Sequence, residues 1–152
     1  MRRAMSGISN PDESLHYRLN LMFRLADLNG YDLRAEYLAS QLAEVSESPV
    51  GPGTVRRHRT GAEVPTPAQR IVYARACGWV NDGEPMTDLL DDDPVKYMNP
   101  LLHVEILVWG QSIGAPMQRG FTEASKALFD LDDVRRYRRH LHETGAIVVK
   151  SA

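Results

Sequence analysis

The sequence has little cysteine and no long hydrophobic run, and both absences exclude classes of protein. Only Cys77 of the 152 residues is a cysteine, which excludes an intramolecular disulfide and a zinc site built from several cysteines. The longest apolar-rich stretch covers residues 101–109, far short of the roughly 20 residues of a membrane-spanning helix. No apolar segment follows the two arginines near the N-terminus, so no secretory signal is expected. These features predict a cytoplasmic protein with no membrane association.

The sequence also lacks an excess of positive charge. Eighteen Lys and Arg against 20 Asp and Glu give a formal net charge of −2, so the whole molecule presents no net positive field to DNA. Any basic surface must therefore be local. The apolar fraction of 43% and the charged fraction of 25% are near the globular average, and the length allows one domain or two small ones.

Signatures of catalysis and metal binding are missing as well. No glycine-rich phosphate loop occurs, and the paired acids at 91–93 and 132–133 lie where linkers and helix caps are expected. Cys77 is interpreted as a small buried hydrophobic residue, and His140 and His142 would diverge on a helix. We therefore expect no enzyme, no catalytic residue, no metal site and no cofactor.

Apolar periodicity and capping residues predict an all-α fold. The expected helices run from an Asn10 cap to Leu28, from an Asp32 cap to Val45, from Pro52 to Arg59, and from Pro67, after a Thr66 cap, to just before Gly78. Within them Val45 and Ile71 are expected to face the core and Arg18 to lie away from it. Further helices are expected at 118–130 and 132–143. Residues 98–111 fit a strand or a helix, of which we favour the helix, and residues 146–149 fit a short strand or a packed tail.

An acidic stretch divides the chain. Residues 81–93 carry six acids, a glycine, a proline and no basic residue, which is typical of a solvated linker with one short turn at 86–90. We therefore predict a DNA-binding domain at 10–92 and a helical oligomerisation domain at 94–152.

The unit from Leu33 to Trp79 is the most informative part of the sequence. Residues 50–75 contain five arginines and one acid, Glu63, so the near-neutral total conceals a basic segment. The short helix at 52–59 would not hold alone. If Val55 and His58 face the core, its other positions are exposed: Gly53, Thr54, Arg56, Arg57 and Arg59. That is the surface a helix-turn-helix presents to the major groove.

The same segment resembles a known family. The residues that carry the resemblance are Thr54-Val55-Arg56-Arg57, Arg59, Gly61, Pro65-Thr66, Tyr73-Ala74 and Cys77-Gly78. They resemble the Xre/Cro-type helix-turn-helix, although His58 stands where that family usually has an apolar residue. Leu15, Arg18-Leu19-Asn20 and Phe23, with the acidic run 88–92, are similar to EspR-like actinobacterial regulators. That resemblance implies a four- or five-helix DNA-binding domain, then a small helical domain that forms a homodimer.

Each arginine on this surface has an expected role. Arginine can bond two acceptors on guanine at once, so Arg56 and Arg57 are the predicted base readers. Gly53 and Thr54 would meet a phosphate at the N-terminus of the helix, and Arg59 and Arg70 would contact phosphates. The alternative is that these arginines only keep a short helix soluble.

A second basic cluster lies at 135–139. It could touch DNA, but we favour a solvated helix face whose arginines pair with nearby acids.

The apolar run at 101–109 must be buried on several sides, within the chain or across a dimer. Together with the resemblance, these features predict a sequence-specific double-stranded DNA-binding transcriptional regulator. A place in the nucleoid is what the resemblance to EspR-like regulators implies. The alternatives are a prophage immunity repressor and a protein-interaction or antitoxin module of the same fold.

Overall fold

The computed structural model of the chain describes residues 11–31, 33–110 and 130–149. These residues are mostly helical. In chain order the elements are α1 (Leu15–Leu28), α2 (Ala35–Ala43), α3 (Pro52–Thr60), α4 (Pro67–Ala76), β2 (Val80–Asn81), β3 (Glu84–Pro85), the 3₁₀ turn η1 (Asp88–Leu90), α5 (Pro94–Trp109) and α7 (Leu131–Glu143). The predicted caps Asn10 and Asp32, and the helix expected at 118–130 except its last residue, lie outside the described residues. Helix α2 has Arg34 as its N-cap, so the prediction that it starts from an Asp32 cap was wrong.

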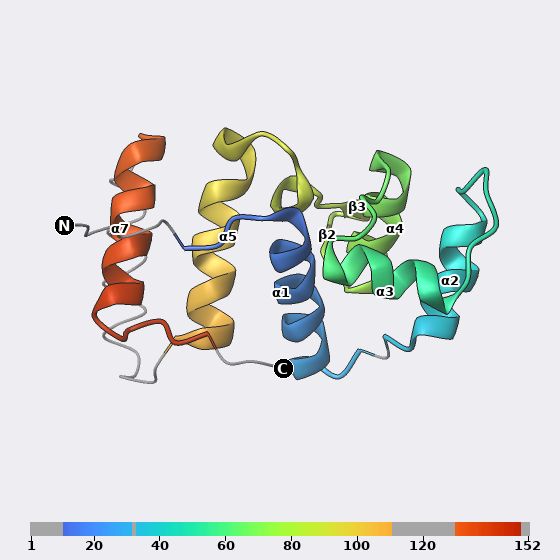
Figure 1. Cartoon of the computed structure of the whole chain (residues 1–152), viewed down its shortest axis with the longest axis horizontal. Helices are drawn as coiled ribbons and strands as arrows, with labels where there is room; N and C mark the ends of the chain where they lie inside the picture. Colours follow the sequence, from blue (N-terminus) through green and yellow to red (C-terminus); the bar gives the residue numbers. More distant parts are fainter. Residues whose placement is uncertain (1–10, 32, 111–129, 150–152) are drawn as a thin grey trace.

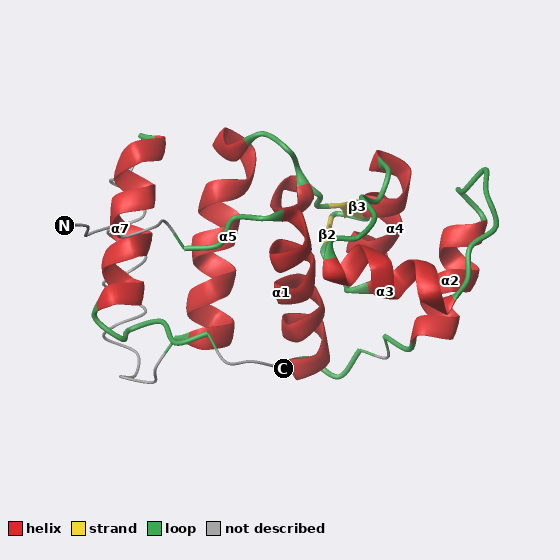
Figure 2. Ribbon diagram, in the orientation of Figure 1, coloured by secondary structure: helices red, strands yellow, loops and turns green. Residues whose placement is uncertain are grey.

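Helix α1 lies at the centre of the molecule. Figure 1 shows α7, α5 and α1 side by side, with α2, α3 and α4 gathered beyond α1. The contacts agree, because α5 packs on both α1 and α7, α3 packs on α1 and α2, and α2 also meets α4. Figure 2 shows that helices form both groups and that the only sheet drawn is the small β2–β3 pair. The all-α prediction holds for the described residues.

The helix starts follow from local capping. The Ser14 hydroxyl accepts from the Tyr17 backbone, the Thr66 hydroxyl from Gln69 and the Asp93 carboxylate from Val95, which satisfies backbone donors that the first turn leaves free. Helix α1 therefore begins at Leu15, later than predicted, because Ser14 rather than Asn10 is its cap. The predicted Thr66 cap is confirmed.

One hydrophobic core runs through both groups of helices. Buried apolar residues extend from α1 through α2–α4 and η1 to α5, α7 and Ile147. Residues 98–109 are helical, as we favoured, and α5 buries apolar side chains against both α1 and α7. Most of the apolar surface of this segment is thus covered within the chain, and Leu107 stays 48% exposed. Among the described helices, none combines the length and apolarity needed to cross a bilayer.

Two residues expected in the core are exposed. Val45 is 42% exposed and Ile71 is 41% exposed. Helix α2 ends at Ala43, so Val45 lies in the turn beyond it. Helix α4 instead buries the face that carries Tyr73 and Ala74. The predictions for Val45 and Ile71 were therefore wrong.

The acidic stretch is not a simple linker. Val80 pairs with Pro85 and Asn81 with Glu84 across a two-residue turn. Both turn residues, Asp82 and Gly83, have positive φ, 52° and 81°, as a type I′ hairpin turn requires. Asp-Gly is the preferred sequence for that turn, so the signal was present in the sequence and was missed.

Buried arginines hold the residues that follow the hairpin. Arg18 donates to the carbonyls of Leu89 and Asp91 at 2.9 and 2.6 Å, and its guanidinium lies 3.7 Å from the centre of the Tyr97 ring. The prediction that Arg18 points away from the core was wrong, because η1 buries carbonyls that need donors. Residues on both sides of the predicted boundary share one core. The division into domains at 92–94 stays a prediction.

Candidate nucleic-acid interface

Helix α3 is short, and its ends are defined by its sequence. Pro52 occupies the first turn after Gly51, and the Thr54 hydroxyl accepts from the Gly51 backbone at 3.3 Å. Gly61 ends the helix with a φ of 85°, and a Cβ there would lie 2.6 Å from the His16 ring of α1. Glycine is therefore needed at position 61 both for the turn and for the approach of α3 to α1.

Helix α1 braces the C-terminal end of α3. The Asn20 amide donates to the Arg59 carbonyl at 2.8 Å, and Arg59 Nε donates back to the Asn20 Oδ1 at 2.8 Å. The Arg59 guanidinium also lies 4.8 Å from the centre of the Phe23 ring. This reciprocal pair and the cation–π contact fix both the helix end and the Arg59 side chain. Asn20 was quoted in the family resemblance, but its role as a brace was not foreseen.

Helix α4 and the turn after α3 hold the buried side of α3. The His58 Nδ1 and the Tyr73 hydroxyl are 2.7 Å apart, and the His58 Nε2 lies 3.3 Å from the Glu63 carboxylate. Burial lowers the pKa of His58, against the opposing effect of Glu63. A histidine on the core face needs such polar partners. Val55 and His58 are buried as predicted.

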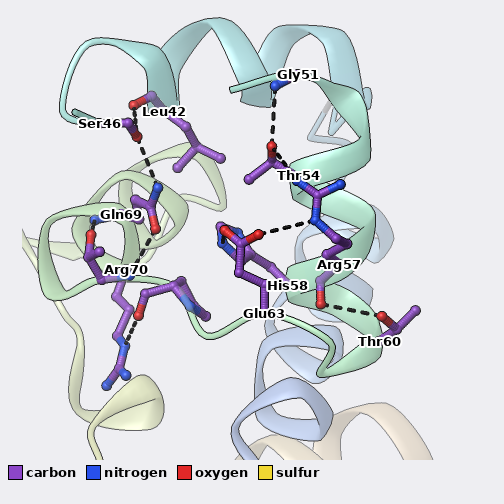
Figure 3. Close-up of polar contacts among 12 residues, drawn as sticks. Leu42, Ser46, Gly51, Thr54, Arg57, His58, Thr60, Glu63, Gln69 and Arg70 are labelled. Carbon is purple, nitrogen blue, oxygen red and sulfur yellow. Dashed lines mark hydrogen bonds and ion pairs between the residues drawn. The ribbon is translucent and has the colours of Figure 1, made fainter. Parts of the chain in front are cut away.

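The turn between α2 and α3 is fastened from α4. Ser46 Oγ donates to the Leu42 carbonyl at 2.6 Å and accepts from the Gln69 amide at 2.9 Å. Figure 3 shows this chain of bonds and, closer to α3, the Arg57–Glu63 pair. The turn is long, but these bonds position α2 against the start of α3.

The outer face of α3 carries three arginines. Arg56, Arg57 and Arg59 are exposed. Arg57 donates to Glu63 at 3.1 Å and to the Thr54 hydroxyl at 3.2 Å, and its bond to Glu63 is the main reason that the pKa of Glu63 is lowered. Arg56 makes no hydrogen bond or ion pair with another residue in the described part of the chain. The face therefore presents one free and two oriented guanidinium groups.

The two residues expected to meet a phosphate differ in exposure. Gly53 is half-buried in the first turn of α3, where backbone N–H groups lack helical acceptors. Thr54 is buried, and its hydroxyl serves Gly51 and Arg57. Thr54 thus caps the helix and orients Arg57, so the expectation of an outward-facing hydroxyl was wrong.

Arg70 is not on this face. Its side chain lies on α4, only 8% exposed, and donates to the carbonyls of Pro65 and Leu90 and to Asp92 at 2.9–3.1 Å. These bonds turn it inward to the residues before α5. We therefore leave Arg70 out of the candidate interface, because its donors are used within the chain.

The second basic cluster is held by acids within the chain. Helix α7 is formed as predicted, and Arg135 pairs with Glu13 at 2.9 Å while Arg136 pairs with Asp133. Arg138 is 1% exposed and pairs with Glu105, which is fully buried. The sequence did not reveal this buried pair, because its members are 33 residues apart.

The described residues bring together no group of three or more side chains that could hold a metal ion. Cys77 is buried as expected, and burial raises the pKa of its thiol to about 12. Comparison with protein-family models, with curated proteins and with solved structures finds no match to this chain. The function must therefore be argued from the arrangement of α3.

Proposed function

We propose that this chain binds double-stranded DNA through α3 and acts as a transcriptional regulator by occupying its sites. The observation that carries the proposal is the face of Arg56, Arg57 and Arg59 on a helix braced from α1 and α4. A short helix held this rigidly can enter the major groove without losing further freedom. Arg56 and Arg57 are the base readers, and Arg59 and the N–H groups near Gly53 contact phosphates.

The charge distribution suits binding that depends on base contacts. The net charge is −2, and Arg70, Arg135, Arg136 and Arg138 are paired with acids. These ion pairs and the negative net charge weaken the attraction to DNA of any sequence, so non-specific affinity is restrained. Base contacts at preferred sequences and binding to clustered sites then supply most of the affinity for DNA.

The test is fluorescence anisotropy with genomic fragments selected on the wild-type chain and with random duplex of the same length. Arg56→Ala should weaken binding to selected fragments by about 10- to 100-fold and weaken binding to random duplex less. The matched control is Arg75→Ala, which removes an exposed arginine on α4. No detectable binding to any duplex at low salt, or equal losses for the two variants, would refute the proposal.

The oligomeric state and the class of regulator belong to the same proposal. A homodimer would read two half-sites related by its two-fold axis. Sedimentation of the full chain tests this, because a truncation at residue 92 would strip α1 of the core it shares with α5. A monomer at micromolar concentration would refute the dimer and leave DNA binding intact. A chromosomal nucleoid regulator should select many genomic fragments, whereas a prophage repressor should select few.

A protein-interaction module is the second candidate function. Three exposed apolar side chains line a small pocket whose lining includes no residue of α3: Tyr37 on α2, Val45 in the turn after α2, and Ile71 on α4. Exposed apolar surface of this kind marks many protein contacts. Two results together would favour this function. The chain would bind no DNA in the assays above, and it would bind a co-purified protein in a way that Ile71→Glu abolishes.

A further inference from the structure

A pocket of about 650 Å³ opens beside α1, apart from the Arg56 and Arg57 side chains. Helices α1, α3 and α5, the segment between α1 and α2, and Val149 contribute to its wall. The residues that matter here are Phe23, Arg24, Tyr31, Arg34, Arg59 and Trp109. Its volume is within the range of small-molecule sites, about 300–1,000 Å³. Arg59 is the one lining residue that the pocket shares with the proposed DNA-binding face.

The pocket combines converging positive charge with aromatic walls. Three arginines from different elements line it, Arg24 from α1, Arg34 before α2 and Arg59 from α3, and Asp27 is the only acid among its lining residues. The like charges of Arg24 and Arg59 on one cavity repel each other, and an anion between them would relieve that repulsion. The electrostatics therefore favour a negatively charged occupant.

Two of the arginines are stacked on aromatic rings. The Arg24 guanidinium lies 4.9 Å from the centre of the Trp109 ring, and that of Arg59 lies 4.8 Å from the centre of the Phe23 ring. Stacking of this kind uses the face of the guanidinium and leaves N–H groups in its plane for a carboxylate. In Arg59 these are the Nη groups, because Nε already donates to Asn20. The same rings, with Tyr31, offer apolar contact to a flat ligand.

We infer that this pocket binds a small organic anion, a carboxylate on a planar apolar body. The carboxylate lies between Arg24 and Arg59, and the planar body packs against the aromatic wall. We choose a ligand with a planar apolar body because a small inorganic anion would leave the aromatic wall of the pocket uncovered. The inference concerns the pocket alone and does not depend on DNA binding.

Isothermal titration calorimetry of the full chain tests the inference with two probes of the same shape. 2-Naphthoate carries the carboxylate, and 2-naphthylmethanol replaces it with a neutral hydroxyl. At neutral pH we expect saturable one-to-one binding of 2-naphthoate, at least about tenfold tighter than that of 2-naphthylmethanol. No saturable binding of 2-naphthoate at millimolar concentration, or equal affinity for the two probes, would overturn the inference.

A pair of arginine variants locates the site. Arg24 is exposed, so Arg24→Gln should fold normally, weaken 2-naphthoate about tenfold and leave 2-naphthylmethanol unchanged. Arg75→Gln removes an exposed arginine that does not line this pocket and should leave both affinities unchanged. If the two variants weaken 2-naphthoate equally, the anion responds to overall charge and the assignment of the pocket is wrong.

Discussion

Replacing Arg138 by leucine should strongly destabilise the fold. Arg138 donates through Nη2 to the Glu105 carboxylate at 2.9 Å and through Nη1 to the Pro11 carbonyl at 3.0 Å. Glu105 also accepts from the Tyr17 hydroxyl at 2.6 Å and lies 3.0 Å from the His142 Nε2. This cluster ties α7 and α5 to α1, so its loss would be felt across the helical layer seen in Figure 1.

The expected magnitude follows from burial. Glu105 is 0% and Arg138 1% exposed, so Arg138→Leu leaves a carboxylate in the core without its cation. Removing one member of a buried pair costs about 3–5 kcal/mol. The double variant Glu105→Leu/Arg138→Leu leaves no buried charge from the pair and should be less destabilised than either single variant. Its remaining cost, about 1–3 kcal/mol, comes from the abandoned Tyr17 hydroxyl and Pro11 carbonyl.

Urea unfolding followed by far-UV circular dichroism measures these differences. Arg136→Leu is the matched control, because Arg136 lies on the same helix and pairs with Asp133 at the surface. It should change stability by no more than about 0.5–1 kcal/mol. A loss for Arg138→Leu no larger than that of Arg136→Leu would refute the reasoning, as would a loss for the double variant equal to the sum of its singles.

Three further outcomes are expected. Arg70→Met should lower the unfolding free energy by about 1.5–3 kcal/mol, because it leaves buried carbonyls without a donor. The DNA affinity of the folded chain should stay unchanged. A loss of affinity in the anisotropy assay as large as that of Arg56→Ala would contradict this. Burial holds the pKa of His58 below its ordinary value, so the unfolded state binds more protons, and stability present above about pH 6.5 is lost below it. Urea midpoints measured from pH 7.5 to 5 should show this loss, and His58→Gln should flatten it; an unchanged profile would show that another group titrates. Arg59 lines the pocket and also lies on α3. A concentration of 2-naphthoate that saturates the wild type should therefore weaken DNA binding by the wild type more than DNA binding by Arg24→Gln. Equal weakening of the two proteins would show that 2-naphthoate acts at another site.

Local signals predicted the bounds of α3 and its buried side well. Pro52 and Gly61 define α3 within one residue of the expected bounds, and Thr66 caps α4 as expected. Val55 and His58 face inward because their spacing places both on one side of a helix. These features depend on residues a few positions apart, so the sequence contains them.

The roles of single polar residues were predicted less well. Thr54 and Arg70 were expected at the surface and are buried, and Arg18 is buried beneath η1. Periodicity shows where an apolar face lies, but a polar side chain enters the core only where distant carbonyls or acids need it. The donors of Arg18 reach acceptors 71 and 73 residues away, and no local pattern records such a distance.

The sequence by itself therefore determined the helices, their caps and the basic segment from 50 to 75, because each arises from near neighbours along the chain. The tertiary structure decided which arginines stay at the surface. It turned Arg18, Arg70 and Arg138 inward to satisfy buried acceptors and left Arg56, Arg57 and Arg59 on the outer face of α3. It also brought Arg24, Arg34 and Arg59 from three separate elements around one pocket. Burial and long-range hydrogen bonding made that selection, and both exist only once the helices have packed.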